Sequence, residues 1–304
     1  MCHTSAPRRR RGAVVALPST VGKQLRITFH GVRGSTPCHG EEVRRYGGNT
    51  SCVSLDADDE HPLLFDLGTG LRYFGRHLPH DGSFRGTCLL THLHWDHTQG
   101  LPFFVPILSH GARLDVYAPI QEDGSSVREA MSRFIAPPLF PVELDRLPGS
   151  MNFYDVGDHD FFVGGYAVRS RLIPHVGNTH GYRVEWEGLS VAYLSDHQQP
   201  HDGSFTATEG ALELVRGADL VIHDAQYTPE EFPLKNTWGH CTVDYAVWLA
   251  AEAGAKRLAL FHHDPVRHDD DVDALLCAAQ KSGREQGVEV FAASEGLTVE
   301  LRSS

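Results

Sequence analysis

Short runs of hydrophobic residues recur along the chain from Leu25 onward, and glycine-rich turns separate several of them. Runs of this length, rich in β-branched and aromatic residues, are typical of β-strands. In the first half they follow one another closely, and a short helix is predicted at 71–77. The strands predicted in this half span 25–31, 52–55, 63–67, 88–91 and 114–118.

The second half repeats the strand pattern and then alternates strands with helices. A helix is predicted over 243–253, because Thr242 can cap its first turn and Gly254 can end it, and another over 271–286. The strands predicted here span 161–172, 182–187, 191–195, 220–223, 257–263, 288–292 and 297–301. Strands that come first and then alternate with helices, twice over, favour an α/β fold with two packed sheets and helices outside.

Residues 121–150 interrupt this pattern. The segment begins with a predicted helix at 126–135 and continues into a proline-rich apolar stretch, 137–141. Such a stretch either covers a pocket or simply crosses the surface. The same two alternatives, pocket wall or core, apply to the nearby phenylalanines, which are Phe103, Phe104, Phe134 and Phe140.

No linker is visible after the first residues, so we predict a single domain over 25–304. Residues 1–24 lack a strand or helix period, and we interpret them as a disordered tail. The run Arg8–Arg11 and the short apolar stretch after it resemble a twin-arginine export signal only faintly, which leaves export as the alternative. No apolar run approaches the roughly 20 residues that span a bilayer, so no membrane partner is expected.

The net charge of the chain is −12, and residues 1–24 contain basic residues but no acidic ones. The body is therefore more acidic still, and an acidic body repels a phosphate backbone. From this balance we expect a small-molecule substrate and no large nucleic acid.

The cysteines indicate the cellular compartment, and the number of histidines indicates metal binding. The six cysteines form no C-x-x-C pair, which is typical of free thiols in a reducing compartment, and we expect a cytoplasmic protein. Histidine is unusually frequent, at 20 residues. Because neutral imidazole is the commonest metal ligand in proteins, this excess favours a metal site.

The strongest motif directly follows the predicted strand at 88–91. It contains His92, His94, Asp96 and His97 within six residues. Successive strand residues alternate between faces, so His92 and His94 can point the same way, and a turn can bring Asp96 and His97 back toward them. Imidazole and carboxylate form the ligand set of zinc and similar divalent ions.

The H-x-H-x-D-H pattern resembles the signature of the metallo-β-lactamase superfamily, and the likeness extends over nearly the whole chain after the tail. It is strongest to the branch that contains ribonuclease Z and the phosphoribosyl cyclic phosphodiesterases. Four further blocks carry it, at 65–70, 174–177, 194–196 and 260–263. The resemblance implies a four-layer αββα sandwich and a hydrolase with two divalent metal ions, zinc in the first place, with manganese or iron as alternatives.

The resemblance also implies a ligand set. His92, His94 and His175 match the ligands of one metal, Asp96, His97 and His262 match those of the other, and Asp196 matches the bridging carboxylate. Two assignments keep a rival: His180 follows the same strand as His175, and His263 adjoins His262 but must face the opposite way on a strand.

Two more residues match positions that act on the leaving group in ribonuclease Z-like enzymes. His240 resembles the proton donor and Asp224 the carboxylate that orients it, with helix capping as the alternative for His240. Asp66 is expected to accept a hydrogen bond from a metal-binding histidine, although an ordinary turn aspartate is the alternative.

These expectations combine into a function. We expect a hydrolase that cleaves a small phosphodiester, cyclic ones included, with a metal-bridging hydroxide, in which Asp96, His240 and Asp224 are the catalytic residues. The alternatives are a lactone, thioester or β-lactam hydrolase, a ribonuclease Z-like RNA endonuclease, and a metal-binding sensor without turnover. The long basic arm expected of ribonuclease Z is not visible in the sequence, and the oligomeric state, including a homodimer, stays open.

A chain that begins near Leu25 is expected to keep the melting temperature and the turnover of the full chain, because residues 1–24 have no apolar period with which to bury surface. Thermal unfolding and turnover of the two chains measure this. A large loss of either would mean that the segment packs on the body or completes the site.

Overall fold

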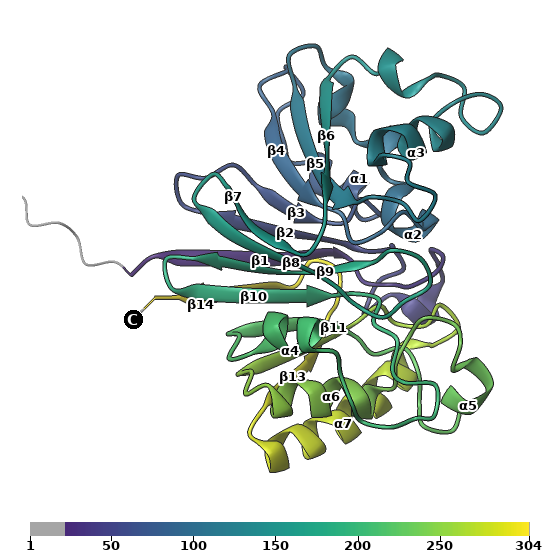
Figure 1. The fold of residues 1–304 in the computed structure, drawn as a ribbon, viewed down its shortest axis with the longest axis vertical. Helices are drawn as coiled ribbons and strands as arrows, with labels where there is room; N and C mark the ends of the chain where they lie inside the picture. Colours follow the sequence, from purple (N-terminus) through teal and green to yellow (C-terminus); the bar gives the residue numbers. More distant parts are fainter. Residues whose placement is uncertain (1–21, 304) are drawn as a thin grey trace, which may run out of the picture.

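The computed structural model describes residues 22–303. Within this range the chain forms two seven-stranded sheets that pack face to face, with helices on both outer faces (Figure 1). This is the four-layer αββα sandwich expected from the sequence. The predicted tail falls almost wholly on residues 1–21, which lie outside the described residues, and Gln24 already belongs to the first strand.

The first sheet has the order β14-β1-β2-β3-β4-β5-β6. Its early strands pair antiparallel as a meander, whereas β3 to β6 run parallel to one another. The strands are β1 (Gln24–Gly31), β2 (Cys52–Ala57), β3 (Leu63–Phe65), β4 (Arg85–Leu89), β5 (Arg113–Pro119), β6 (Ser150–Val156) and β14 (Thr298–Arg302).

The second sheet has the order β13-β12-β11-β10-β9-β8-β7 and repeats this plan. Strands β7 to β10 form an antiparallel meander, and β10 to β13 are parallel. Its strands are β7 (His159–Val163), β8 (Tyr166–Leu172), β9 (His180–Trp186), β10 (Leu189–Leu194), β11 (Leu220–Asp224), β12 (Arg257–Phe261) and β13 (Glu289–Ala292).

The longer helices cover the two outer faces, and two one-turn helices lie at the edge of the sandwich (Figure 1). Those of the first half are α1 (Leu71–Gly75), α2 (Trp95–Thr98) and α3 (Val127–Phe134), with short 3-10 turns at Glu41–Val43, Leu101–Phe103, Val105–Leu108 and Leu144–Arg146. Those of the second half are α4 (Glu209–Val215), α5 (Phe232–Lys235), α6 (Val243–Glu252) and α7 (Asp269–Gln286). Among residues 22–303, no helix is both long and apolar enough to cross a membrane.

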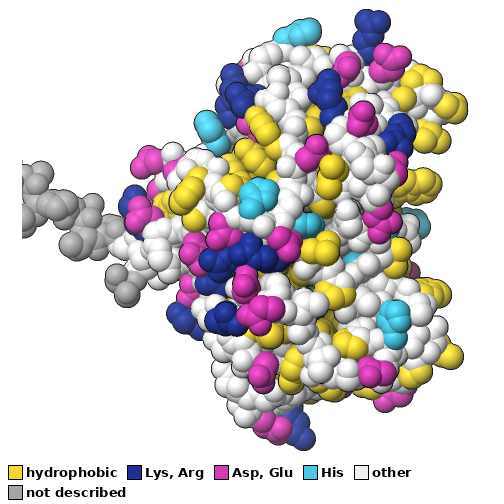
Figure 2. All heavy atoms as spheres, viewed as in Figure 1, with side chains coloured by type: hydrophobic (Ala, Val, Ile, Leu, Met, Phe, Trp, Pro, Cys, Tyr) yellow, Lys and Arg dark blue, Asp and Glu magenta, His cyan; other side chains and the backbone are white. Residues whose placement is uncertain are grey.

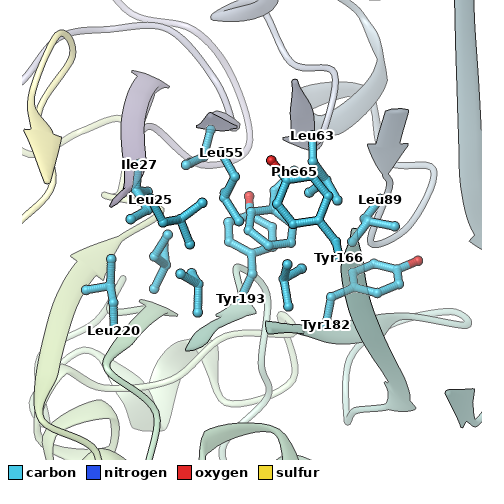
Figure 3. Packing of buried hydrophobic residues seen from close by; sticks show 14 of the residues in the cluster. Leu25, Ile27, Leu55, Leu63, Phe65, Leu89, Tyr166, Tyr182, Tyr193 and Leu220 are labelled. Carbon is cyan, nitrogen blue, oxygen red and sulfur yellow. The ribbon is translucent and has the colours of Figure 1, made fainter. Parts of the chain in front are cut away.

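Three buried clusters hold the four layers together. The largest lies between the sheets, where Phe65 of the first sheet stacks on Tyr193 of the second with ring centroids 4.5 Å apart (Figure 3). A second joins α4, α6 and α7 to the second sheet, and a third joins α1 and α3 to the first sheet. Burying one large apolar side chain contributes about 1.5–3 kcal/mol, so both faces of each sheet add to stability.

The structure corrects two element predictions and adds a strand that was not predicted. The strand predicted at 161–172 is a hairpin of β7 and β8, because Gly164 takes the left-handed backbone conformation with φ of 54°. The strand predicted to reach residue 263 ends at Phe261, since His262 also has a positive φ of 54°. Strand β6, at the end of the 121–150 segment, was not predicted.

Candidate metal centre

The candidate site residues lie just beyond the carboxyl ends of several strands. His92 and the short helix α2 follow β4 in one sheet, while Asp196 and His262 follow β10 and β12 in the other. His175 lies in the loop between β8 and β9. Parallel strands bring their carboxyl ends to one edge of a sheet, which in Figure 1 is the side where α2 and α5 lie. Residues more than 160 positions apart in sequence therefore meet there.

Group 1 consists of His92, His94 and His175, whose ring nitrogens converge. His92 Nε2 lies 2.8 Å from His94 Nδ1, and His175 Nε2 lies 3.3 Å from the same atom. One ligand atom from each of the three residues lies within 4.8 Å of the others. These three nitrogens could hold one divalent ion.

Group 2 consists of Asp96, His97 and His262. Asp96 Oδ2 lies 3.2 Å from His97 Nε2 and 3.1 Å from His262 Nε2. The backbone N–H of Ser35 donates to the same oxygen at 2.7 Å, which orients the carboxylate. This mixed nitrogen and oxygen set could hold a second divalent ion.

Asp196 lies between the two groups and turns one oxygen toward each. Its Oδ2 lies 3.8 Å from His92 Nε2 and 3.7 Å from His175 Nε2. Its Oδ1 lies 3.1 Å from His97 Nε2 and 3.3 Å from His262 Nε2. This is the placement expected of a carboxylate shared by two ions.

Two buried atoms at this point have no hydrogen-bond partner among the described residues, Asp196 Oδ1 and His97 Nε2. A buried polar atom without a partner costs free energy, and a carboxylate costs more. A bound cation would satisfy both atoms at once, so the donor set fits divalent metal ions.

The electrostatics of the cluster point the same way. Burial lowers the pKa of His92 well below its usual range and the pKa of His175 to about 4, so both are neutral and available as ligands at neutral pH. Burial also opposes charge on His97, yet Asp96 and then Asp196 outweigh it and raise its pKa well above the usual value. The carboxylates thus create a negative potential that a cation can neutralise.

Asp66 is fully buried and holds the ring of His97 in its orientation. Its carboxylate accepts hydrogen bonds from the backbone N–H and hydroxyl of Thr91, from Nδ1–H of His97 at 2.7 Å, and from the hydroxyl of Tyr193 at 2.8 Å. Anchoring Nδ1 of His97 leaves Nε2 to face the cluster. The expectation that Asp66 binds a metal-site histidine therefore agrees with its position.

Two glycines make room for the histidine rings. A Cβ at Gly34 would lie 2.5 Å from the ring of His262, and a Cβ at Gly239 would lie 2.3 Å from Nδ1 of His175. Gly239 also has a φ of 94°, and its carbonyl accepts from His175 Nδ1–H at 2.6 Å. Any side chain at either position would push a proposed ligand out of place.

The structure places the two rival histidines away from the cluster. Nδ1 of His180 lies 2.8 Å from the hydroxyl of Ser170. Nε2 of His263 donates to the carbonyl of Ala293 at 3.0 Å, on the opposite side of the chain from His262. Their geometry leaves His175 and His262 as the candidates.

His240 and Asp224 form a pair beside the cluster. Nδ1–H of His240 donates to Asp224 Oδ2 at 2.8 Å, and the ring centroids of His240 and His262 are 5.0 Å apart. Burial would lower the pKa of His240, but the Asp224 carboxylate outweighs it and raises that pKa. The helix-cap alternative is wrong, because Thr242 caps α6 by accepting from the Tyr245 backbone N–H.

Sequence reasoning missed three residues that hold the centre together. These are Ser35, whose N–H binds Asp96, Tyr193, whose hydroxyl binds Asp66, and Gln226, whose Nε2 lies 3.4 Å from His262 Nδ1. The glycine-rich turn at 31–34 was a usable signal for Ser35. Tyr193 gave none, because a tyrosine within an apolar strand looks like ordinary core.

Comparisons with known proteins match this architecture. A family model described as a beta-lactamase superfamily domain matches residues 63–263, a range that includes every proposed ligand. The chain is 27% identical to ribonuclease Z of Natronomonas pharaonis, over 91% of this chain and 98% of that protein.

Two solved structures have the same fold. The metallo-beta-lactamase fold protein YhfI of Bacillus subtilis superposes with a TM-score of 0.70 and 18% identity, covering 92% of this chain and 100% of that one. The short form of human tRNase Z gives 0.62 and 21% identity, covering 90% and 98%.

The expectation of a small-molecule substrate and no large nucleic acid is wrong, because curated relatives matched over most of their length are named ribonuclease Z. It rested on the net charge of −12, which is a property of the whole surface. A phosphate group is bound by the local potential of one site, and metal ions can make that potential positive within an acidic protein.

Changing Asp66 to Asn is expected to weaken zinc binding by about 10- to 100-fold, because the residue would lose its charge and one of the acceptor oxygens that orient His97. Competition with a chromophoric chelator measures the dissociation constant, and circular dichroism checks the fold. Asp115→Asn, on β5 and away from the centre, is the matched control and should bind as the parent does. Unchanged affinity in Asp66→Asn would limit Asp66 to a structural role.

Proposed function

The chain belongs to the beta-lactamase superfamily, and from that premise we propose that it is a binuclear metal-dependent phosphodiesterase that cleaves RNA. The coarser description, a metal-binding hydrolase of the metallo-beta-lactamase fold, follows from the family and the histidine–aspartate cluster. We further propose that residues 25–304 form one domain that carries the whole reaction.

The observation that carries the proposal is the pairing of His240 with Asp224 beside a cluster of seven ligand candidates. Asp224 is fully buried and holds Nδ1–H of His240, which leaves Nε2 without a partner among the described residues. The raised pKa of His240 favours its protonated form. A positioned imidazolium is a suitable donor for a leaving group that is a poor anion, such as a ribose alkoxide.

The ligand candidates divide the remaining work. His92, His94 and His175 would hold one ion, and Asp96, His97 and His262 the other, with Asp196 between them. Two divalent ions supply an activated water and neutralise charge on the phosphate. Asp66 and Ser35 N–H keep the ligands in place, while His240 donates its proton to the departing oxygen.

RNA as substrate is supported by the relatives named ribonuclease Z. The alternative of lactone, thioester or β-lactam hydrolysis would use the same cluster. The His240–Asp224 pair favours the phosphodiester, because a sugar alkoxide depends strongly on receiving a proton. The sensor alternative leaves this pair without a role.

We expect about two metal ions per chain, by the two-group geometry described above. Elemental analysis of protein purified without chelator and then supplied with excess zinc measures the stoichiometry. Asp96→Asn is expected to bind less metal and to lose most activity while keeping its fold, because the change leaves the size of the side chain unaltered. A stoichiometry that stays at one in the parent protein would contradict the binuclear proposal.

His240→Ala is expected to slow cleavage of an RNA oligonucleotide by about 10²- to 10⁴-fold and barely to affect a nitrophenyl phosphodiester. The difference arises because nitrophenolate leaves without a proton, whereas a ribose alkoxide does not. Asp224→Asn should show the same selectivity, more weakly.

The control for this experiment is His110→Ala, an exposed histidine outside the cluster. It should leave both rates unchanged. Equal losses on both substrates in His240→Ala, with metal content unchanged, would mean that His240 positions the substrate rather than protonating the leaving group. No loss on either substrate would remove the main support for a phosphodiesterase.

A further inference from the structure

A large apolar pocket adjoins the metal centre without including its ligand candidates. Its volume is about 920 Å³, within the range of small-molecule sites. One wall comes from α2 and the chain after it, and includes Trp95 and Phe103. The opposite wall comes from the 121–150 segment, which thereby lines a pocket and does not merely cross the surface.

Aromatic side chains line this pocket but stay exposed to solvent. Trp95 is 69% exposed and Phe103 is 58% exposed, and Phe140 packs edge-on against Phe103 at 6.0 Å. Phe104, in contrast, is fully buried in the core. In Figure 2, yellow hydrophobic side chains also run along the right-hand edge of the molecule, where α2 and α3 lie above and α5 lies below. Exposed aromatics gathered in a concave surface indicate binding more than folding.

The pocket is tied to the metal centre through Trp95. In the sequence this residue stands between His94 of group 1 and Asp96 of group 2, so its backbone belongs to the centre while its side chain lines the adjoining pocket. Pro37, two residues after the Ser35 N–H that binds Asp96, also lines the pocket.

Polar groups border the apolar surface. Asn49, Thr69 and Gln99 line the same pocket and present amide and hydroxyl groups. Flat aromatic walls edged by amides suit a ring system that is apolar on its faces and carries hydrogen-bonding atoms on its rim. The amide nitrogens of Asn49 and Gln99 already donate to Glu295 Oε2 at 3.0 Å and to Thr50 Oγ1 at 3.5 Å, so the groups offered to a ligand are the two amide oxygens. A purely aliphatic chain would leave these oxygens without partners, which is unfavourable.

We propose that this pocket is a nucleobase subsite, in which the base next to the reacting phosphate stacks on Trp95 between α2 and the 121–150 segment. The inference rests on the proposed function, because it assumes that a phosphate is bound at the metal centre. Any base can stack on an aromatic side chain, while the bordering amides can form hydrogen bonds with the edge of that base.

The chain offers a matched control in Trp238. It is 61% exposed and also stands near the centre, two residues before His240, but it does not line the pocket. A nonspecific effect of losing an exposed tryptophan beside the site would appear in both variants. An effect of the subsite would appear only in Trp95→Ala.

The test measures binding to the zinc-loaded full chain by calorimetry, with adenosine monophosphate and ribose 5-phosphate as probes. Both carry the same phosphate and sugar, and only the first has a base. The parent protein should bind the nucleotide more tightly by roughly 5- to 150-fold. Trp95→Ala should remove most of this difference, Phe103→Ala should reduce it, and Trp238→Ala should preserve it.

Three results would overturn the subsite: equal affinity of the parent for both probes, loss of the difference in Trp238→Ala but not in Trp95→Ala, or equally tight binding of hexyl phosphate. Trp95→Ala could also disturb the metal centre, because Trp95 lies within the ligand motif. Phe103→Ala controls for this, because Phe103 lines the same pocket but lies outside that motif. A base preference that depends on Trp95 would support the subsite even if no phosphodiester were cleaved. Cleavage without the preference would refute only the subsite.

Discussion

The arrangement of the candidate metal centre depends on the hydrogen bonds that the buried carboxylate of Asp66 accepts. It follows β3 in the first sheet and accepts from Thr91 and His97 of that half, but also from Tyr193 on β10 of the second sheet. Phe65, its neighbour, stacks on Tyr193. The same contact therefore locks the two sheets together and sets the direction of a metal-site imidazole. Asp66 also has a positive φ of 59°, a conformation that costs free energy outside glycine and that the surrounding hydrogen bonds offset.

The cluster in front of Asp66 gathers charge that an ordinary core would not tolerate. Asp96 and Asp196 are almost fully buried, and burial alone would raise their pKa values. The neighbouring histidines outweigh this and hold the pKa of both carboxyls well below the usual range. Such strongly shifted groups in one place are typical of functional sites. Divalent ions fit this cluster, because a bound cation would neutralise the two carboxylates directly and leave the histidines free to coordinate it as neutral ligands.

The candidate metal centre and the apolar pocket are built from different parts of the structure. Strand ends and neighbouring loops of both sheets supply the ligand candidates and the His240–Asp224 pair. The apolar pocket is instead built from Trp95, the chain after α2 and the 121–150 segment. The apolar lining of the pocket and its exposed aromatic side chains fit recognition by stacking.

The sequence by itself determined the fold class, most strands and the local ligand motif, because strand periodicity and the spacing of His92, His94, Asp96 and His97 are local properties of the chain. It also nominated His175, Asp196 and His262 through resemblance. It missed the β7–β8 turn, although Gly164-Gly165 is a local hairpin signal. It could not end β12 at Phe261, since that end depends on the positive φ of His262, which a histidine adopts only where tertiary contacts select it. Only the tertiary structure brought His175 rather than His180 to the cluster, placed the Tyr193 hydroxyl on Asp66, and turned the two oxygens of Asp196 toward different groups. Those outcomes depend on distances between residues far apart in sequence, and such distances exist only once the two sheets have packed.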